Sequence, residues 1–136
     1  MKTESDTIKK VLVLLNDVDP LLNRVTKNKL EKDMGWDCMV AVSYDQAMSI
    51  FVEQNPDAVI TEILILDHKN RNGVDLIEDI RVRESATVKK VPIIIFSEMD
   101  EEGSFKKALK SGATACYSKN NISLNLLISE LQKFVD

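Results

Sequence analysis

The stretch VLVLLNDVDP occupies residues 11–20 and decides how the rest of the sequence is interpreted. Its first five residues are continuously apolar, which is typical of a central parallel β-strand that is covered on both faces. The residues that follow are acidic, and Asp19-Pro20 supplies a helix N-cap and a proline at the first helical position. The stretch therefore predicts a buried strand, an acidic loop and a helix over residues 20–33. Gly35 is the residue that stops this helix.

Four more short apolar segments follow, and helical patterns separate them. The expected strands lie at residues 37–42, 58–61, 91–96 and 113–118. A second helix is expected after the Ser43 capping box, and a third near Val74. The fourth helix has an inner face of Phe105, Ala108 and Leu109, and the fifth begins at Leu124. This alternation predicts an α/β fold: a doubly wound, five-stranded parallel sheet in the order 2-1-3-4-5 with five helices, of the flavodoxin-like type.

Composition restricts the classes of function. The 136 residues fit a single domain over residues 1–136, and 44% are hydrophobic with a net charge of −4. No apolar run approaches the roughly 20 residues of a membrane span, and basic residues are spread along the chain, so we expect a cytoplasmic protein that binds neither membrane nor nucleic acid. Cys38 and Cys116 are expected to be reduced thiols, and one histidine, His68, is too few for a zinc site.

Polar residues follow the predicted strands at the edge where an open parallel sheet binds its ligands. Asn16 and Asp17 follow the first strand, Glu62 the third, Ser97 the fourth and Lys119 the fifth. The first turn has no glycine to expose backbone N–H groups to a phosphate, and its carboxylates attract Mg²⁺ instead. The pattern predicts a pocket for a cation and an anion, not for a nucleotide.

With these residues in this order, the chain resembles the response-regulator receiver domain of bacterial two-component systems, a CheY-like domain, from about residue 9 to residue 135. Receivers carry an acidic pair after the first strand, which corresponds to Asn16-Asp17 or Asp17-Val18. Their phosphorylated aspartate aligns with Glu62, their Ser or Thr with Ser97 in VPIIIFS, and their lysine with Lys119 in GATACYSK. The resemblance implies phosphorelay signal transduction, a Mg²⁺ site made of Asp17, Asn16 and Glu62, and a protein partner such as a histidine kinase or a downstream effector.

The sequence also departs from the receiver pattern. Glu62 replaces the phosphoacceptor aspartate, Cys116 stands at the position of the switch aromatic, and Asn120 follows the lysine where receivers have proline. The loop after Glu62 is longer than usual, and we expect Asp67 to lie in a flexible part of it. Glutamate moves the attacking oxygen by about 1 Å, a misplacement that can cost on the order of 10²-fold in rate.

We therefore expect an atypical receiver, or pseudo-receiver, that binds a protein partner as a monomer or weak dimer, is not an enzyme, has lost phosphotransfer and holds Mg²⁺ weakly or not at all. By resemblance, the partner surface is the fourth helix, fifth strand and fifth helix. Whether Glu62 mimics a phosphorylated aspartate or forms only a structural salt bridge stays open. One alternative is a phosphorylation-competent response regulator with Asp67 or Glu62 as acceptor. Another is a haloacid-dehalogenase-like phosphatase, suggested by the DxD motif at residues 17–19, although that family needs an acidic pair after the lysine.

Overall fold

The computed structural model describes residues 8–15, 21–65, 67–84, 90–98 and 103–135. Its strands are β1 (Lys10–Leu14), β2 (Asp37–Val40), β3 (Ala58–Thr61), β4 (Ile93–Ser97) and β5 (Ala115–Ser118). All neighbouring strands are parallel, and the sheet order is β2-β1-β3-β4-β5. The helices are α1 (Leu21–Met34), α2 (Tyr44–Gln54), α3 (Gly73–Glu84), α4 (Ser104–Ser111) and α5 (Leu124–Val135). The predicted fold class and strand order are confirmed.

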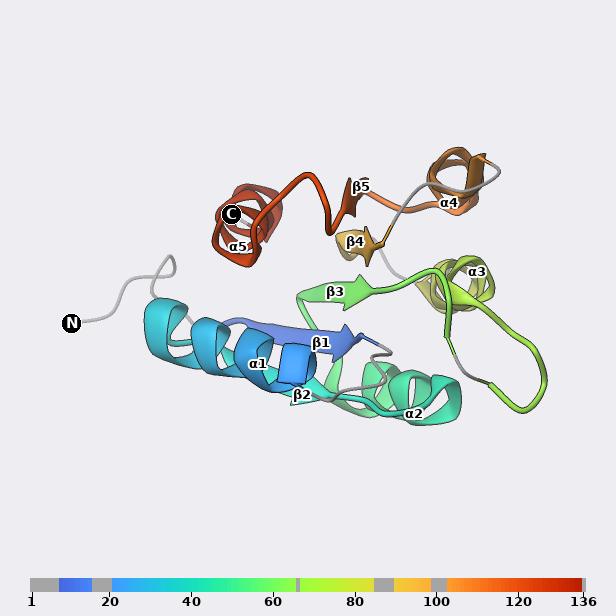
Figure 1. Cartoon of the computed structure of the whole chain (residues 1–136). Helices are drawn as coiled ribbons and strands as arrows, with labels where there is room; N and C mark the ends of the chain where they lie inside the picture. Colours follow the sequence, from blue (N-terminus) through green and yellow to red (C-terminus); the bar gives the residue numbers. More distant parts are fainter. Residues whose placement is uncertain (1–7, 16–20, 66, 85–89, 99–102, 136) are drawn as a thin grey trace.

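The helices cover both faces of the sheet, as Figure 1 shows. Alternate residues of β1 enter different cores: Leu12 and Leu14 pack with α2, α3 and α4, whereas Val11 and Val13 pack with α1 and α5. Because successive side chains of a strand point to opposite faces, an unbroken apolar run is what a strand between two helical layers requires. The stretch at residues 11–15 meets that requirement, and all five of its side chains are buried.

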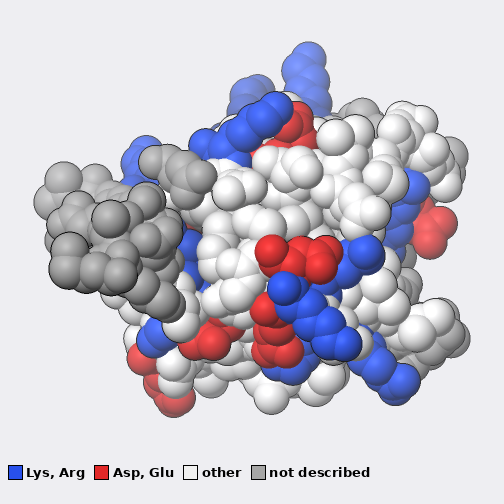
Figure 2. Space-filling view, turned by 90° about the vertical axis from the view of Figure 1, so that its left-hand side faces the viewer, with Lys and Arg blue, Asp and Glu red and all other residues white. Residues whose placement is uncertain are grey.

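Helices α1 and α5 lie on the left-hand side of the molecule in Figure 1. Figure 2 shows this side, where basic and acidic side chains lie next to one another without a continuous area of one sign. Nucleic-acid recognition depends on clustered basic side chains, and the visible part of this side has no such cluster. None of the helices in the described ranges is long and apolar enough to cross a membrane.

The boundaries of α2 arise from local sequence. The hydroxyl of Ser43 accepts a hydrogen bond from Gln46 N at 3.1 Å, and the Gln46 side chain accepts one from Val42 N at 2.7 Å. The first bond satisfies a backbone donor of the first helical turn, and the second joins the helix to the residue before the N-cap. At the other end Asn55 adopts a left-handed conformation, with φ of 52°, and Pro56 follows it. The expected start and end of this helix are therefore observed.

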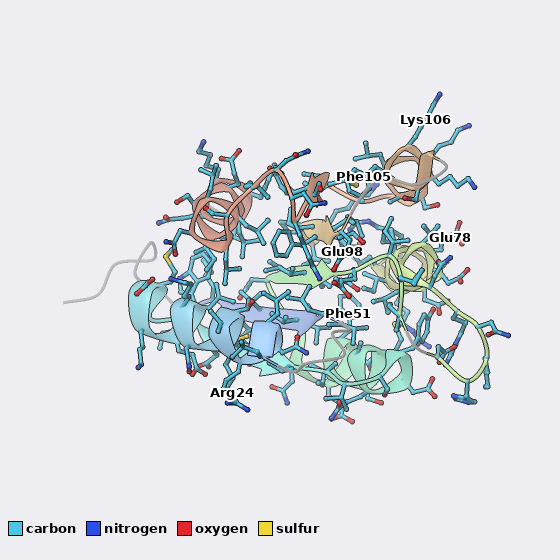
Figure 3. The ribbon with its side chains drawn as sticks, viewed as in Figure 1. Arg24, Phe51, Glu78, Glu98, Phe105 and Lys106 are labelled. Carbon is cyan, nitrogen blue, oxygen red and sulfur yellow. The ribbon has the colours of Figure 1, made fainter. Side chains whose placement is uncertain are left out.

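The inner face of α4 differs from the prediction at one residue. Ala108 is fully buried and Phe105 packs against the core, but Leu109 is 49% exposed. Figure 3 shows Phe105 on the side of α4 toward β5, while Lys106 extends away from the sheet. The prediction for Leu109 is wrong because α4 spans only eight residues and buries a narrow stripe of side chains.

Candidate functional site

Three of the predicted site residues meet at the carboxyl ends of β3, β4 and β5. Glu62 directly follows β3, Ser97 ends β4 and Lys119 directly follows β5. Lys119 Nζ forms an ion pair with Glu62 Oε1, and only 13% and 7% of the two side chains are exposed. Ser97 is 7% exposed, and its Oγ accepts a hydrogen bond of 3.4 Å from Ile63 N. Because these three strands are neighbours, the sheet itself brings the three side chains to one place.

The backbone of Glu62 is held from three directions. Its N–H donates to Leu14 O at 3.2 Å, which extends the pairing of β1 and β3 by one bond, and its carbonyl accepts from Thr61 Oγ1 at 3.1 Å. The start of α3 lies against the same carbonyl: a Cβ atom on Gly73 would stand 2.1 Å from Glu62 O. Only a glycine permits this approach, so the position of α3 depends on residue 73.

The segment that carries Lys119 is tied to the end of β4. Lys119 N donates to Ser97 O at 2.6 Å, and Ser118 Oγ and Asn120 Nδ2 both donate to Glu98 O, at 2.8 and 3.1 Å. Glu98 directly follows β4, at its carboxyl end (Figure 3). The ammonium of Lys119 is 5.9 Å from the centre of the Phe96 ring, a distance at which a cation is attracted to the ring face.

Asp67, which we expected to lie in a flexible part of the loop, is bound by Arg71. Its side chain is 3% exposed, and Arg71 binds both of its oxygens: Nε donates to Oδ2 at 2.8 Å and Nη2 to Oδ1 at 2.9 Å. Arg71 also pairs with Asp45 at 2.9 Å and lies 3.9 Å above the centre of the Tyr44 ring. Hydrogen bonds from the Arg71 side chain, foremost, hold the pKa of the Asp67 carboxyl well below its usual range. The loop is thus anchored to α2.

Sequence reasoning did not identify the role of Arg71. The spacing of Asp67 and Arg71 could have indicated their ion pair, because acidic and basic side chains four residues apart can pair when the intervening backbone turns as in a helix. The contacts with Tyr44 and Asp45 come from a helix more than 25 residues earlier in the chain, since the bond to Asp45 spans 26 positions. No local pattern indicates such a pairing.

The remaining predicted residues have different outcomes. Asn16 and Asp17, two of the expected metal ligands, lie outside the residues that the structure describes. Across the described ranges, no group of three or more His, Cys, Asp or Glu side chains is arranged to hold a metal ion. Cys116 is half-buried, with its Sγ 3.7 Å from Phe105 O. Cys38 is buried, which raises the pKa of its thiol to about 12. Neither of the two cysteines, both of which lie in the described ranges, is part of a disulfide bond.

Comparisons with known proteins agree with this geometry. The structure is similar to the receiver domain of the Francisella response regulator 1452, with a TM-score of 0.75 and 26% identity over 93% of this chain and 96% of that one. It is also similar to a two-component response regulator from Clostridium difficile, with a TM-score of 0.77 and 23% identity over 93% of this chain and 95% of that one. The Vibrio cholerae chemotaxis protein CheY4 matches with a TM-score of 0.79 and 17% identity, over 94% and 99% of the two chains.

Sequence comparison points to the same group of proteins. A search of curated proteins finds no significant match. The sequence profile of the response regulator receiver domain, however, matches residues 13–132. This range includes the end of β1, all of β2 to β5 and α1 to α4, and most of α5. A match over most of the sequence, together with the sheet order and the residues at the strand ends, decides the assignment. The chain belongs to the response regulator receiver domain family.

Proposed function

We propose that this receiver domain acts as a protein-interaction module in two-component signalling and that phosphotransfer has been lost. The observation that carries the proposal is the ion pair between Glu62 and Lys119. By the resemblance to receivers, Glu62 corresponds to the residue that is phosphorylated and Lys119 to their lysine. The carboxylate that would have to attack a phosphoryl donor is already neutralised by the lysine that would have to stabilise the transferred group.

Phosphoryl transfer depends almost entirely on positioning and on charge stabilisation. At this site the glutamate carboxylate is buried, with 5% of the residue exposed, and one of its oxygens is bound to an ammonium. A reaction would require the pair to separate and the carboxylate to move. A positional error of about 1 Å already costs on the order of 10²-fold in rate, so we expect transfer to be very slow.

Glu62, paired as it is with Lys119, does not suit a tightly bound Mg²⁺ ion. When bound in a receiver, the ion would help to neutralise the charge of the transferred group. Glu62 is the one predicted ligand within the described ranges, and its carboxylate faces the ammonium of Lys119, which repels a divalent cation. We infer that Mg²⁺ binding through Glu62 is weak or absent.

The two other functions have less support. Phosphorylation at Asp67 is opposed by the Arg71 side chain, which engages both carboxylate oxygens of a residue whose side chain is 3% exposed. The haloacid-dehalogenase alternative is not favoured, because the receiver profile matches residues 13–132. We propose that residues 1–136 form one non-enzymatic, cytoplasmic domain, a monomer or weak dimer, whose partner is a histidine kinase or an effector protein.

Incubation with acetyl phosphate and Mg²⁺ tests the proposal. Intact-mass spectrometry should find the protein unmodified, while a phosphorylatable receiver treated in parallel gains about 80 Da for one phosphoryl group. The Asp67→Asn variant identifies the acceptor if any modification occurs. A substantial mass gain that persists in Asp67→Asn would overturn the proposal, and its loss in Glu62→Gln would make Glu62 the acceptor. A gain that disappears in this variant would establish phosphorylation at Asp67.

A further inference from the structure

Arg71 joins the loop between β3 and α3 to the start of α2. Its Nη2 donates to Asp45 Oδ1 at 2.9 Å, and its guanidinium lies 3.9 Å above the centre of the Tyr44 ring. The same group binds both oxygens of Asp67 within the loop, from Nε at 2.8 Å and from Nη2 at 2.9 Å. Only 24% of the Arg71 side chain is exposed. One residue therefore holds the loop against α2.

The two residues after Arg71 belong to the start of α3. Asn72 Oδ1 accepts hydrogen bonds from Val74 N at 2.9 Å and from Asp75 N at 3.1 Å, and Asp75 Oδ2 accepts one from Asn72 N at 2.8 Å. These reciprocal bonds form a helix cap, which fixes the backbone of residue 72 relative to α3. Because Arg71 directly precedes this cap, adjacent residues contact α2 and begin α3.

Gly73 connects this arrangement to the Glu62 site. Gly73 N donates to Ile63 O at 2.6 Å, and a Cβ atom at residue 73 would stand 2.1 Å from Glu62 O. Ile63 N donates in turn to Ser97 Oγ at 3.4 Å. The backbone of residues 62 and 63 thus lies between the start of α3 and the end of β4. Since close-packed interiors transmit strain, a displacement of residue 73 moves this backbone and the carboxylate that pairs with Lys119.

We propose that Arg71 is a positioning residue for the Glu62 site. By holding the loop on α2, Arg71 sets the place of Gly73 and thereby the backbone from which the Glu62 carboxylate extends. This inference rests on the proposed function, in which the pair of Glu62 with Lys119 blocks phosphotransfer. Arginine suits position 71 because its planar guanidinium binds two carboxylates and lies on the Tyr44 ring at the same time, whereas lysine has a single ammonium.

Two measurements on the full chain test the proposal. One follows the NMR signals of the Glu62 carboxyl carbon and backbone amide. The other is the rate at which the N-hydroxysuccinimide ester of acetic acid acetylates Lys119, relative to Lys133, whose side chain is 75% exposed. Arg71→Gln should shift the Glu62 signals and speed acetylation of Lys119 by about threefold to tenfold, the effect of losing roughly one hydrogen bond. Asp45→Asn, at a side chain that is 62% exposed, removes one contact without disturbing the core and should act in the same direction.

Two further variants separate positioning from other effects. Arg71→Lys keeps the positive charge but lacks the planar fork, so it should behave like Arg71→Gln. Arg81→Gln is the matched control, because Arg81 is another arginine with a largely buried side chain, of which 17% is exposed. It binds Gly112 O at 2.9 and 2.7 Å and Glu84 at 2.6 Å instead of the loop. This variant should lower stability and leave both measurements unchanged.

The positioning role is refuted if Arg71→Gln and Asp45→Asn both keep the wild-type values, or if Arg71→Lys restores them. It is also refuted if Arg81→Gln changes them as much as Arg71→Gln does. Failure of the proposed function is a separate observation, because it requires phosphorylation of the wild-type protein by acetyl phosphate. The effect of Arg71 on Glu62 and Lys119 is measured without a phosphoryl donor.

Discussion

A glutamate at position 62 places its carboxylate one methylene farther from the backbone than an aspartate would. At this length the carboxylate of Glu62 reaches Lys119, which directly follows β5. Both side chains are almost completely buried. Burial makes such a pair sensitive to the loss of either charge, since the remaining charge is left in a poorly solvated environment. The pair is thus the residue-level feature on which the proposed loss of phosphotransfer depends.

Substituting Glu62→Gln should reduce the free energy of unfolding. The loss should exceed the ~0–1 kcal/mol of an exposed pair and approach at most the ~3–5 kcal/mol of a fully buried one. Urea denaturation measures it, with Glu31→Gln as the control, because Lys27 and Glu31 form a pair whose side chains are 43% and 40% exposed. Equal losses in the two variants would contradict a strong contribution of the buried pair.

The same variant separates the two interpretations of Glu62. If the glutamate acts as a built-in mimic of a phosphorylated aspartate, its neutralisation should shift the NMR signals of α4 and β5 as well as those of the site. If the pair is only structural, the shifts should stay next to residues 62 and 119 while stability falls.

At the scale of elements, the start of α3 determines how the backbone of Glu62 is held. Gly73→Ala should destabilise the protein by about 1–3 kcal/mol, the usual cost of overpacking. The added Cβ would meet backbone atoms, Glu62 O and Ile63 Cα, which cannot move aside as a flexible side chain can. Thermal unfolding and the NMR signals of Glu62 and Ser97 are the measurements.

Gly35→Ala is a suitable comparison for this change. Gly35 has a φ of 68° with open space around it, so an alanine there is strained by its backbone conformation alone. Both variants should lose stability, but only Gly73→Ala should move the signals of Glu62. Unchanged Glu62 signals in Gly73→Ala would show that α3 does not position the site.

The loop between β3 and α3 should depend on pH through Asp67. Arg71 lowers the pKa of this carboxyl below its ordinary value of 3.8 in the folded protein. A lowered folded pKa means that its stabilisation is fully present above the unfolded pKa and is lost as the pH falls toward the folded value. The stability difference between wild type and Asp67→Asn should therefore stay constant from neutral pH to about pH 5 and shrink below about pH 4.

Urea unfolding across this pH range measures that difference. The stability difference between wild type and Arg71→Gln should change with pH in the same way, because this variant lacks the side chain that lowers the pKa of Asp67. A difference that persists unchanged to roughly pH 3 would mean that the carboxylate is not stabilised by Arg71.

For the molecule as a whole, the α4–β5–α5 surface should exist in one arrangement. Cys116 has no aromatic ring to change its orientation, and the neighbouring Tyr117 is partly buried and packs against the core on the α1 and α5 face of the sheet. We expect a single set of NMR signals for residues 106–117, with or without acetyl phosphate. Two slowly exchanging sets would contradict a fixed surface, whereas changes that require the phosphoryl donor would indicate a phosphorylation-driven switch.

The sequence by itself was sufficient to predict the sheet order, both helical layers and the meeting of Glu62, Ser97 and Lys119. These features depend on local information: buried parallel strands are continuously apolar, caps and breakers lie within a few residues of the helices, and the carboxyl ends of neighbouring strands share one edge. The error at Leu109 arose because a periodic pattern does not reveal how wide a stripe the neighbouring elements cover.

Only the tertiary structure decided which polar groups pair. Arg71 reaches Asp45 across 26 positions, and Asn120 reaches Glu98 across 22. Neither contact has a sequence spacing that distinguishes it from many other pairs. Each depends on where the fold places two segments that are distant in the sequence. The pairing of Glu62 with Lys119 likewise became definite only when β3, β4 and β5 fixed the distance between two long, flexible side chains.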